Sequence, residues 1–461
     1  NGALTPQAFA DTLDCMHSFA SMCKLYKTQK IFAVGTAAMR NATNGELLAS
    51  AIRKETGIKL QVISGKTEAY MSYLGVINTI PVKDALIFDL GGGSTELILV
   101  KNRKLVESTS LPIGCVNLTT SLKLKNKLSP EGALKLKKAI AAHVNKVPWL
   151  KAGNIPLVGV GGTARTVGKI DQKRVKYYTP KIHNYQFAIR VFKATYKYIK
   201  GTTLAERKQI SGLAVDRADI IIAGSAIINA LADKTKAKRF IVSGCGLREG
   251  IFDKYRSRIL KRPVITPDIL TTSTDDLMHL YSPDIEHSTL VSDYALMLFD
   301  AWKNIHNIDE SWRPLLRTAA LLHDIGIRIN YYSHARHSGY MIENSGLFGV
   351  DHLKIVYAAI MAAWHNGVSR SYMRSKQYKV LLSETTIAAL SRCALLIAIG
   401  EALDYTQTST LTKVAARHSK NGAILNITAP TTPTIELHQL KILQKWFLKS
   451  MGVPLIVKAH K

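Results

Sequence analysis

The sequence predicts a layered α/β fold that is followed by an almost entirely helical half. Two observations carry this prediction. In the first half, short apolar runs typical of buried strands alternate with helical stretches, as expected where helices pack on a sheet. From Arg262-Pro263 onward, apolar residues recur mainly at helical spacing. With 461 residues, 47% of them apolar, the chain is long enough to bury more than one core.

Three helices and two strands are predicted before residue 84. The first helix, 5–27, has Thr5 as its N-cap and Pro6 at its first helical position. A second helix, 44–56, ends at Gly57. The remaining elements are two strands and a helix, over 31–34, 60–63 and 67–76.

The most informative segment is 87–100, which reads IFDLGGGSTELILV. One apolar run ends at Asp89 and another begins after Glu96, so the segment predicts two strands joined by a tight turn. Its glycines leave backbone N–H groups open to an anion, and the flanking carboxylates suit Mg²⁺, which bridges carboxylate and phosphate oxygens. An ordinary hairpin with a glycine-rich turn is the alternative. The predicted phosphate-binding residues are Gly91, Gly92, Gly93, Ser94 and Thr95.

A second glycine-rich turn lies between a predicted strand, 155–160, and a helix, and reads GVGGTART. Its spacing also fits a dinucleotide-binding fingerprint, but no acidic residue that would bind a ribose follows about twenty residues on. We therefore interpret Gly161, Gly162 and Thr163 as a further phosphate- or nucleotide-binding turn. This part of the chain also has a basic helix and a strand, 129–147 and 239–243.

The net charge is strongly positive, with 62 Lys and Arg against 33 Asp and Glu, formally +29. Such a charge predicts a polyanionic partner, although a generally solvating surface is the alternative. No helix-turn-helix, zinc-finger or RNP-type motif accompanies it, so no specific nucleic acid is expected, whereas inorganic polyphosphate would release counterions in the same way. The candidate surfaces are Lys135, Lys137 and Lys138 on the basic helix, and Lys173, Arg174 and Lys176 in a basic and aromatic stretch.

Cysteine usage and hydropathy bear on location. Five scattered cysteines without a CxxC pair indicate reduced thiols and predict a cytoplasmic protein. No apolar run reaches the roughly 18–20 residues of a membrane span, so no membrane association is expected. The longest apolar stretch, 393–400, is predicted to be a buried helix.

Six blocks of the sequence resemble motifs of the exopolyphosphatase/guanosine pentaphosphate phosphohydrolase (Ppx/GppA) family and occur in the order that the family has. They read AVGTAAMRNATN, VISGKTEAYMSYLGV, IFDLGGGSTELILV, GVGGTART, DRADIIIAG and SGCGLREG. The resemblance implies an α/β actin-like core of two lobes, in the ribonuclease H-like superfamily of hexokinase and Hsp70. Relatives open with a first phosphate-binding loop that has no counterpart here, so a truncated first lobe is expected. The expected parts are the remnant of the first lobe (1–83), the second lobe (84–261), a helical HD-like domain (262–408) and a strand–helix–strand segment (409–461).

The helical half resembles an HD domain through a His-Asp pair. The segment 315–325 predicts an apolar helix that carries His323 and Asp324, and with His287 these are the candidate ligands of a second divalent metal. His334, His337 and His365 are further candidates, and the distant acid is either Glu401 or Asp404. A structural role without metal is the favoured interpretation of this domain, and a working metal site is the alternative.

The resemblance also assigns chemistry to single residues. Glu68 matches the family's catalytic glutamate, which would orient or deprotonate the attacking water, while a first-turn glutamate that favours the helix dipole is the plain alternative. Arg40 would bind phosphate, and Asp89 and Glu96 would hold Mg²⁺. A structural ion pair is expected for Arg217.

The leading predicted function is Mg²⁺-dependent removal of terminal orthophosphate from inorganic polyphosphate. Hydrolysis of pppGpp to ppGpp uses the same groups and is the close alternative. A catalytically weak polyphosphate- or nucleotide-binding sensor is the third possibility. The expected partner is therefore inorganic polyphosphate or a guanosine polyphosphate, and a homodimer is expected.

Overall fold

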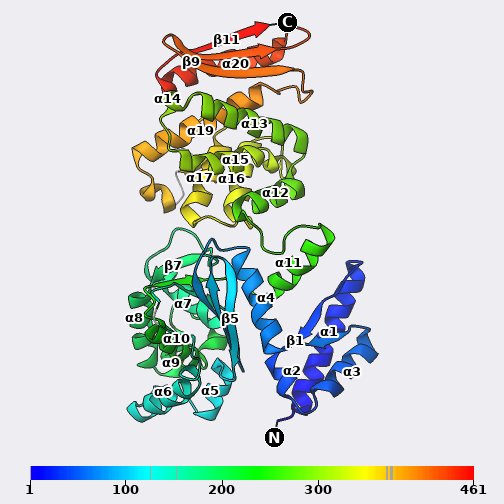
Figure 1. The fold of residues 1–461 in the computed structure, drawn as a ribbon, viewed down its shortest axis with the longest axis vertical. Helices are drawn as coiled ribbons and strands as arrows, with labels where there is room; N and C mark the ends of the chain where they lie inside the picture. Colours follow the sequence, from blue (N-terminus) through cyan, green and yellow to red (C-terminus); the bar gives the residue numbers. More distant parts are fainter. Residues whose placement is uncertain (1, 125, 152, 370–371, 374–376, 461) are drawn as a thin grey trace. The chain divides into compact units, whose positions relative to one another are not determined.

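The computed structural model describes residues 2–124, 126–151, 153–369, 372–373 and 377–460. The chain divides into two compact units, Asn1–Ile265 and Thr266–Lys461. Figure 1 shows a sheet with helices in the first unit and a helical second unit that also carries a small sheet.

A six-stranded sheet organises the first unit, in the order β5-β4-β3-β6-β8-β7. Its strands are β3 (Ala85–Leu90), β4 (Thr95–Lys101), β5 (Lys104–Leu111), β6 (Leu157–Val160), β7 (Tyr185–Ala188) and β8 (Arg239–Val242). The first three form an antiparallel meander, β6 and β8 run parallel to β3, and β7 is antiparallel at the edge. The predicted hairpin and the predicted strands near 155–160 and 239–243 are confirmed, whereas β5 and β7 were not predicted.

Helices cover both faces of this sheet (Figure 1). Successive residues of a strand point to opposite faces, and in β3 Leu86 and Phe88 enter one core while Ile87 enters the other. The core on the side of Ile87 is completed by α4 and α11, and the opposite core by α5, α6, α7, α8 and α10. Their bounds, with short α9, are α4 (Gly65–Ile77), α5 (Cys115–Ser121), α6 (Pro130–Val144), α7 (Gly162–Arg174), α8 (Ile189–Lys200), α9 (Leu204–Lys208), α10 (Ile221–Thr235) and α11 (Leu247–Ile259).

Glycines allow α4 and α11 to pack with their main chains in contact. A Cβ on Gly75 would lie 2.2 Å from the Gly246 carbonyl oxygen, and one on Gly250 would lie 1.8 Å from that of Met71. Neither clash can be relieved by turning a side chain, because both involve backbone atoms. The close contact fixes α4, and with it the position of Glu68, against the sheet.

The remainder of the first unit is a small parallel pair of strands with three helices. The elements are α1 (Pro6–Leu25), β1 (Ala33–Gly35), α2 (Ala37–Asn41), α3 (Gly45–Thr56) and β2 (Leu60–Val62). Thr5 Oγ1 accepts a hydrogen bond from Ala8 N, and α3 ends at Gly57 with φ of 73°. The sequence predictions for these two helix ends are confirmed.

The second unit is mainly helical. Its helices are α12 (Ile269–Tyr281), α13 (Ile285–Ala301), α14 (Lys303–His306), α15 (Arg313–Leu321), α16 (His334–Asn344), α17 (His352–Ala363), α19 (Glu384–Ala402) and α20 (Thr434–Met451). A three-stranded sheet of order β11-β10-β9 consists of β9 (Lys413–Ser419), β10 (Gly422–Thr428) and β11 (Leu455–His460). The predicted C-terminal strand, helix and strand are confirmed, and β9 was not predicted.

Two helices of this unit, α15 and α19, bear on the sequence predictions. The helix predicted over 315–325 ends at Leu321, and His323 Nδ1 donates a hydrogen bond of 2.7 Å to the Ala320 carbonyl, one of the last carbonyl groups of this helix. Helix α19 is long and apolar enough to cross a membrane by length and composition, but 56% of its apolar window is buried inside the protein. The predicted burial of 393–400 is confirmed, since every residue there is buried.

Candidate active site

The glycine-rich hairpin brings two acidic side chains together. In the antiparallel pair of β3 and β4, Asp89 lies directly opposite Glu96, and the turn between the strands consists of 91–94. Directly opposite residues share a face, and Asp89 follows Ile87 on the face covered by α4. Ser72 of α4 donates a hydrogen bond to Asp89, and Ser110 of β5 donates one of 2.8 Å to Glu96.

Glu68 joins these two carboxylates from the first turn of α4. Ser64 caps this helix, and its Oγ accepts a hydrogen bond from Thr67 N at 3.1 Å. The helix begins close to β5, because a Cβ on Gly65 would lie 2.7 Å from Ser110 Cβ. Arg40 Nη1 lies 3.3 Å from Glu68 Oε2 and also donates to the Ile63 carbonyl at 2.6 Å.

All three carboxyl groups have raised pKa values, chiefly because burial disfavours the charged form. The pKa of Glu96 rises to about 7, and the nearby negative charge of Glu68 adds to the effect of burial. Burial also raises the pKa of Glu68, against the opposing effect of Arg40. The pKa of Asp89 is raised by burial and held down in part by Ser72 and Arg165. A cation at this face would offset the cost of ionising the three groups.

The glycine turn is held by the start of α5. Cys115 N and Val116 N donate to the carbonyls of Gly91 and Gly92 at 3.0 and 2.9 Å. The carbonyl groups of the turn are therefore bonded to α5. Over the residues that the structure describes, the backbone N–H groups of Gly92 and Gly93 donate to no protein acceptor and are free to bind a ligand. Backbone amides that are not otherwise bonded are the groups that bind phosphate oxygens.

The second glycine turn lies beside the first. Strands β3 and β6 are parallel neighbours, so the turns that follow them meet at one edge of the sheet. Gly161 has φ of 101°, and a Cβ there would lie 2.5 Å from the Leu90 carbonyl oxygen, so only glycine fits. A Cβ on Gly162 would lie 2.0 Å from Arg217 Cζ, which shows that the guanidinium packs directly on this turn.

Of the three hydroxyl groups predicted to bind phosphate, two contact other parts of the protein instead. Thr95 is fully buried, and its Oγ1 donates to the Ile113 carbonyl at 2.6 Å, on the face away from the carboxylates. Thr163 is 1% exposed and packs against Gly224 of α10. Ser94 lies in the turn itself and bonds Glu96. The main chain of the two turns therefore offers more to an anion than their hydroxyl groups do.

Two arginines at the site were missed by the sequence reasoning. The structural ion pair expected for Arg217 is wrong: in the described part of the chain it has no acidic partner, and Asp219 acts on the buried Arg207 instead. Arg217 lies close enough to Cys115, at the start of α5, to lower the pKa of a thiol that burial raises. Arg165, in the first turn of α7, acts in the same way on Asp89. The available signal was the position of each arginine in a glycine-containing block, GGTART and DRADIIIAG.

The helical unit brings most of its candidate ligands together. The side chains of His287, His323 and Asp324 converge, as do those of Asp324, His334 and His365, with the ligand atoms of each set within 4.8 Å of one another. These are the two such groups found among the described residues, so the carboxylates of the first unit form no equally tight set. His337 lies outside both groups. Burial lowers the pKa of His323 and lowers that of His365 to about 4.

The two candidate acids of the helical unit occupy different places. Asp404 Oδ2 lies 2.8 Å from His287 Nδ1, and Glu401 Oε2 lies 3.6 Å from His365 Nε2. Asp404 therefore contacts the outer nitrogen of a candidate ligand, while Glu401 faces the group itself.

The predicted basic surfaces are exposed but partly paired. Lys135 lies 2.7 Å from Glu131, and Arg174 lies 2.6 Å from the buried Asp171. Of the six residues predicted for these surfaces, Lys137, Lys138, Lys173 and Lys176 are exposed and have no ion pair within the described part of the chain.

Comparison with known proteins gives a family match over both units. Residues 1–258 match the Ppx/GppA phosphatase family, and residues 269–445 match Ppx/GppA phosphatase, domain III. The guanosine-5'-triphosphate,3'-diphosphate pyrophosphatase of Aeromonas salmonicida is 28% identical over 347 residues, which are 73% of this chain and 66% of that protein. A bifunctional 3-dehydroquinate synthase/phosphatase of Fusobacterium nucleatum is 32% identical over 252 residues, 53% of this chain and 38% of that protein. The chain thus spans just under two thirds of the Aeromonas relative.

A solved structure is similar in fold. An exopolyphosphatase from Cytophaga hutchinsonii aligns with a TM-score of 0.52 and 22% identity, over 58% of this chain and 86% of that one. The chain therefore shares its fold with this structure over somewhat more than half of its length.

Proposed function

Because the chain belongs to the Ppx/GppA phosphatase family, we propose that the hairpin site removes the terminal phosphate from a chain of phosphoanhydrides. The observation that carries the proposal is the meeting of two glycine turns and three carboxylates at one sheet edge. Phosphoryl transfer needs positioned oxyanion donors, a group that orients water and compensation of the developing charge. The amides and arginines of the site would supply the first, and Glu68 the second.

The roles follow from position and charge. The main chain of Gly92, Gly93 and the second turn would bind the terminal phosphate, with Arg217 on its oxygens. Glu68 would orient or deprotonate the attacking water, and its raised pKa makes it a better base than an exposed glutamate. Arg40 would keep Glu68 in place when no substrate is bound and would contact phosphate when it is.

Asp89 and Glu96 fit a magnesium ion by their chemistry. Both are carboxylates, both lie on the face covered by α4, and burial makes their ionisation costly without a cation. Mg²⁺ usually takes one or two protein carboxylates and completes its coordination with water and phosphate, so a tight cage of protein ligands is not needed. The ion would neutralise charge on the leaving and transferred phosphoryl oxygens.

The preferred substrate is inorganic polyphosphate. A net charge of +29 suits a long polyanion better than a nucleotide, since a longer chain reaches more lysines. The second candidate is guanosine pentaphosphate, which is favoured by the similarity to the guanosine-5'-triphosphate,3'-diphosphate pyrophosphatase of Aeromonas salmonicida. Both reactions break the same bond type, so the same groups would serve.

The test is orthophosphate release from long-chain polyphosphate and from pppGpp, with Mg²⁺ and with EDTA. We expect release that depends on Mg²⁺ and is lost in Glu68→Gln, with the larger kcat/KM for polyphosphate. A larger kcat/KM for pppGpp would establish the second candidate, and no release from either substrate would overturn the proposed function.

A further inference from the structure

We propose that the helical unit holds a centre for two divalent transition-metal ions, bridged by Asp324 and separate from the hairpin site. The residues that would bind the ions are His287 and His323 on one side of Asp324, and His334, His365 and Glu401 on the other. The inference does not depend on the function proposed for the first unit.

Four imidazole rings of this cluster present the same nitrogen to its centre. The Nδ1 atoms of His323, His334 and His365 lie 2.7, 3.0 and 2.6 Å from the carbonyl oxygens of Ala320, Tyr331 and Ala362. His287 Nδ1 lies 2.8 Å from an Asp404 carboxylate oxygen. Carbonyl and carboxylate oxygens only accept hydrogen bonds, so each Nδ1 carries a proton, and Nε2 is the nitrogen of each ring that is left to bind a metal ion. Metal-binding histidines are held in this way by partners on their outer nitrogen.

The centre of the cluster has acceptors without donors. His323 Nε2 and Asp324 Oδ1 are among the buried polar atoms of the described residues that have no hydrogen-bond partner. His334 Nε2 and His365 Nε2 lie 3.2 Å apart, and among the described residues Asn366 Nδ2 is the amide that lies within hydrogen-bond distance of this pair, 3.2 Å from His334 Nε2. Buried acceptors without a partner destabilise a folded protein, and a cation would satisfy them together.

Asp324 lies between two sets of nitrogens. Its Oδ2 is 3.6 Å from His323 Nε2 and 4.0 Å from His287 Nε2, while its Oδ1 is 3.2 Å from His334 Nε2. One carboxylate oxygen thus faces each set, which is the arrangement of a bridging ligand. A ligand set of imidazole nitrogens and carboxylate oxygens favours divalent transition metals such as Mn, Fe, Co, Ni or Zn over calcium and magnesium.

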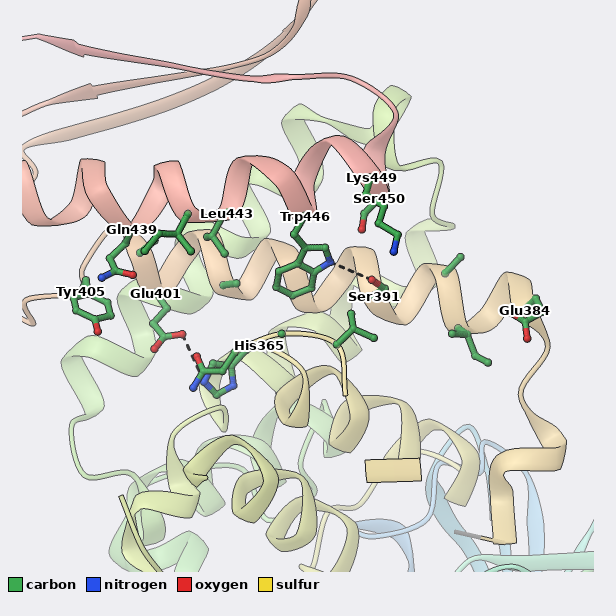
Figure 2. A pocket seen from close by; sticks show the side chains of 18 residues that line it. His365, Glu384, Ser391, Glu401, Tyr405, Gln439, Leu443, Trp446, Lys449 and Ser450 are labelled. Carbon is green, nitrogen blue, oxygen red and sulfur yellow. Dashed lines mark hydrogen bonds and ion pairs between the residues drawn. The ribbon is translucent and has the colours of Figure 1, made fainter. Parts of the chain in front are cut away.

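A cavity gives access to one end of this cluster. It has a volume of about 800 Å³ and reaches His365 and Glu401, whose side chains point toward each other at one end of the pocket (Figure 2). Helices α19 and α20 form its walls, with Trp446 and Tyr405 among the lining residues. Three or four protein ligands per ion leave coordination positions open, and those near His365 face this cavity. An oxygen anion could occupy them, and an ion bound there would act as a Lewis acid toward it.

The first experiment measures metal content. We expect protein purified without chelator to contain about two transition-metal ions per chain by elemental analysis, and the melting temperature of EDTA-treated protein to rise on adding Mn²⁺, Co²⁺ or Zn²⁺. Asp324→Asn, which is nearly isosteric, should lose both the ions and the rise in melting temperature. His337→Ala on the same helix as His334 should keep both. Folded wild-type protein that binds no metal and shows no rise in melting temperature would overturn the proposal, whether or not the variants fold.

The second experiment tests the open positions. The visible absorption bands of the Co²⁺-loaded protein should change on adding inorganic phosphate, and Glu401→Gln should alter this response more than His337→Ala does. Bands of the wild-type protein that stay unchanged by phosphate would show that the cavity reaches no open position and would overturn that part of the proposal.

Discussion

The two candidate sites of this protein are built in opposite ways. In the first unit the groups come from adjacent strands and the turns that follow them, with Asp89 and Glu96 only a tight turn apart. In the helical unit the ligands come from separate helices, and His287 meets Asp404 across 117 residues of sequence. The first site presents main-chain amides and carboxylates, and the second presents imidazole lone pairs.

The comparison teaches how each kind of site is held. Strand register fixes the hairpin site, since a slip of one residue would turn Asp89 to the opposite face of the sheet. Outer hydrogen bonds on Nδ1 fix the histidine cluster, since the packing of helices alone would leave each ring free to flip. A variant at one site should therefore change the property of that site, phosphate release or metal content, and leave that of the other site unchanged.

The largest effect is expected at Glu68. Glu68→Gln keeps the shape of the side chain but removes the base, and it should lower kcat for phosphate release by about 10²–10⁴ with little change in substrate binding. The exposed Glu107→Gln on β5 is the matched control and should leave kcat unchanged. Steady-state kinetics would contradict the assignment if the Glu68 variant kept most of its kcat, and metal content of the helical unit should be unaffected in either variant.

The second effect concerns the turn beside the hairpin. Gly161→Ala should lower turnover at least about tenfold and destabilise the protein by about 1–3 kcal/mol, because its backbone is in a strained region for alanine and its Cβ would strike Leu90. Gly57→Ala is matched to it, with positive φ but open space, and should cost about 1 kcal/mol without loss of turnover. Kinetics and urea unfolding measure the two quantities, and equal effects of both variants on turnover would show that the turn is not part of the site.

The third effect is the pH dependence of Glu96. Its pKa is raised from 4.5 to about 7 in the folded protein, so the folded state binds more protons than the unfolded one between these values. In EDTA, the contribution of protonated Glu96 to the free energy of unfolding is fully present below pH 4.5. The free energy of unfolding then falls by about 1–3 kcal/mol as the pH rises through 7 and Glu96 ionises.

Glu96→Gln should lack this loss, so its free energy of unfolding relative to the wild type should increase with pH over the same window. Added Mg²⁺ should restore the wild-type protein at pH 7. Urea unfolding at several pH values measures the difference. If the free energy of unfolding of the two proteins changed with pH in parallel, the pKa of Glu96 would not be raised in the folded protein.

The smallest effect concerns the basic helix α6. The double variant Lys137→Glu, Lys138→Glu should weaken the binding of long polyphosphate by a few-fold. It should also make the binding constant depend less steeply on salt concentration, since fewer counterions are released on binding. Tripolyphosphate and pppGpp reach fewer lysines and should change less. Charge reversal at Lys173 and Lys176 tests the second surface in the same way. Equal salt slopes for long and short substrates would mean that the charge solvates the surface, and pppGpp would then become the favoured substrate.

The sequence by itself determined the local framework of this protein. The N-cap at Thr5, the helix end at Gly57 and the hairpin at 87–100 were predicted because each depends on neighbours in the chain. These are a hydroxyl near a free amide, a glycine at positive φ, and two apolar runs on either side of consecutive glycines. The acidic pair of the hairpin followed from the same local pattern, and the family to which the chain belongs followed from the resemblance of six sequence blocks.

Only the tertiary structure decided which distant groups meet. Arg217 packs on Gly162 and not against an acid, because α10 and its preceding turn bring it beside the second glycine turn, and no local pattern encodes that approach. The helix at 313–321 ends before the His-Asp pair, and His323 Nδ1 donates to a carbonyl group in the last turn of this helix. Among the candidate histidines, the structure brings His334 and His365 to Asp324 and leaves His337 outside, since this depends on how the helices pack and on which outer nitrogen finds an acceptor.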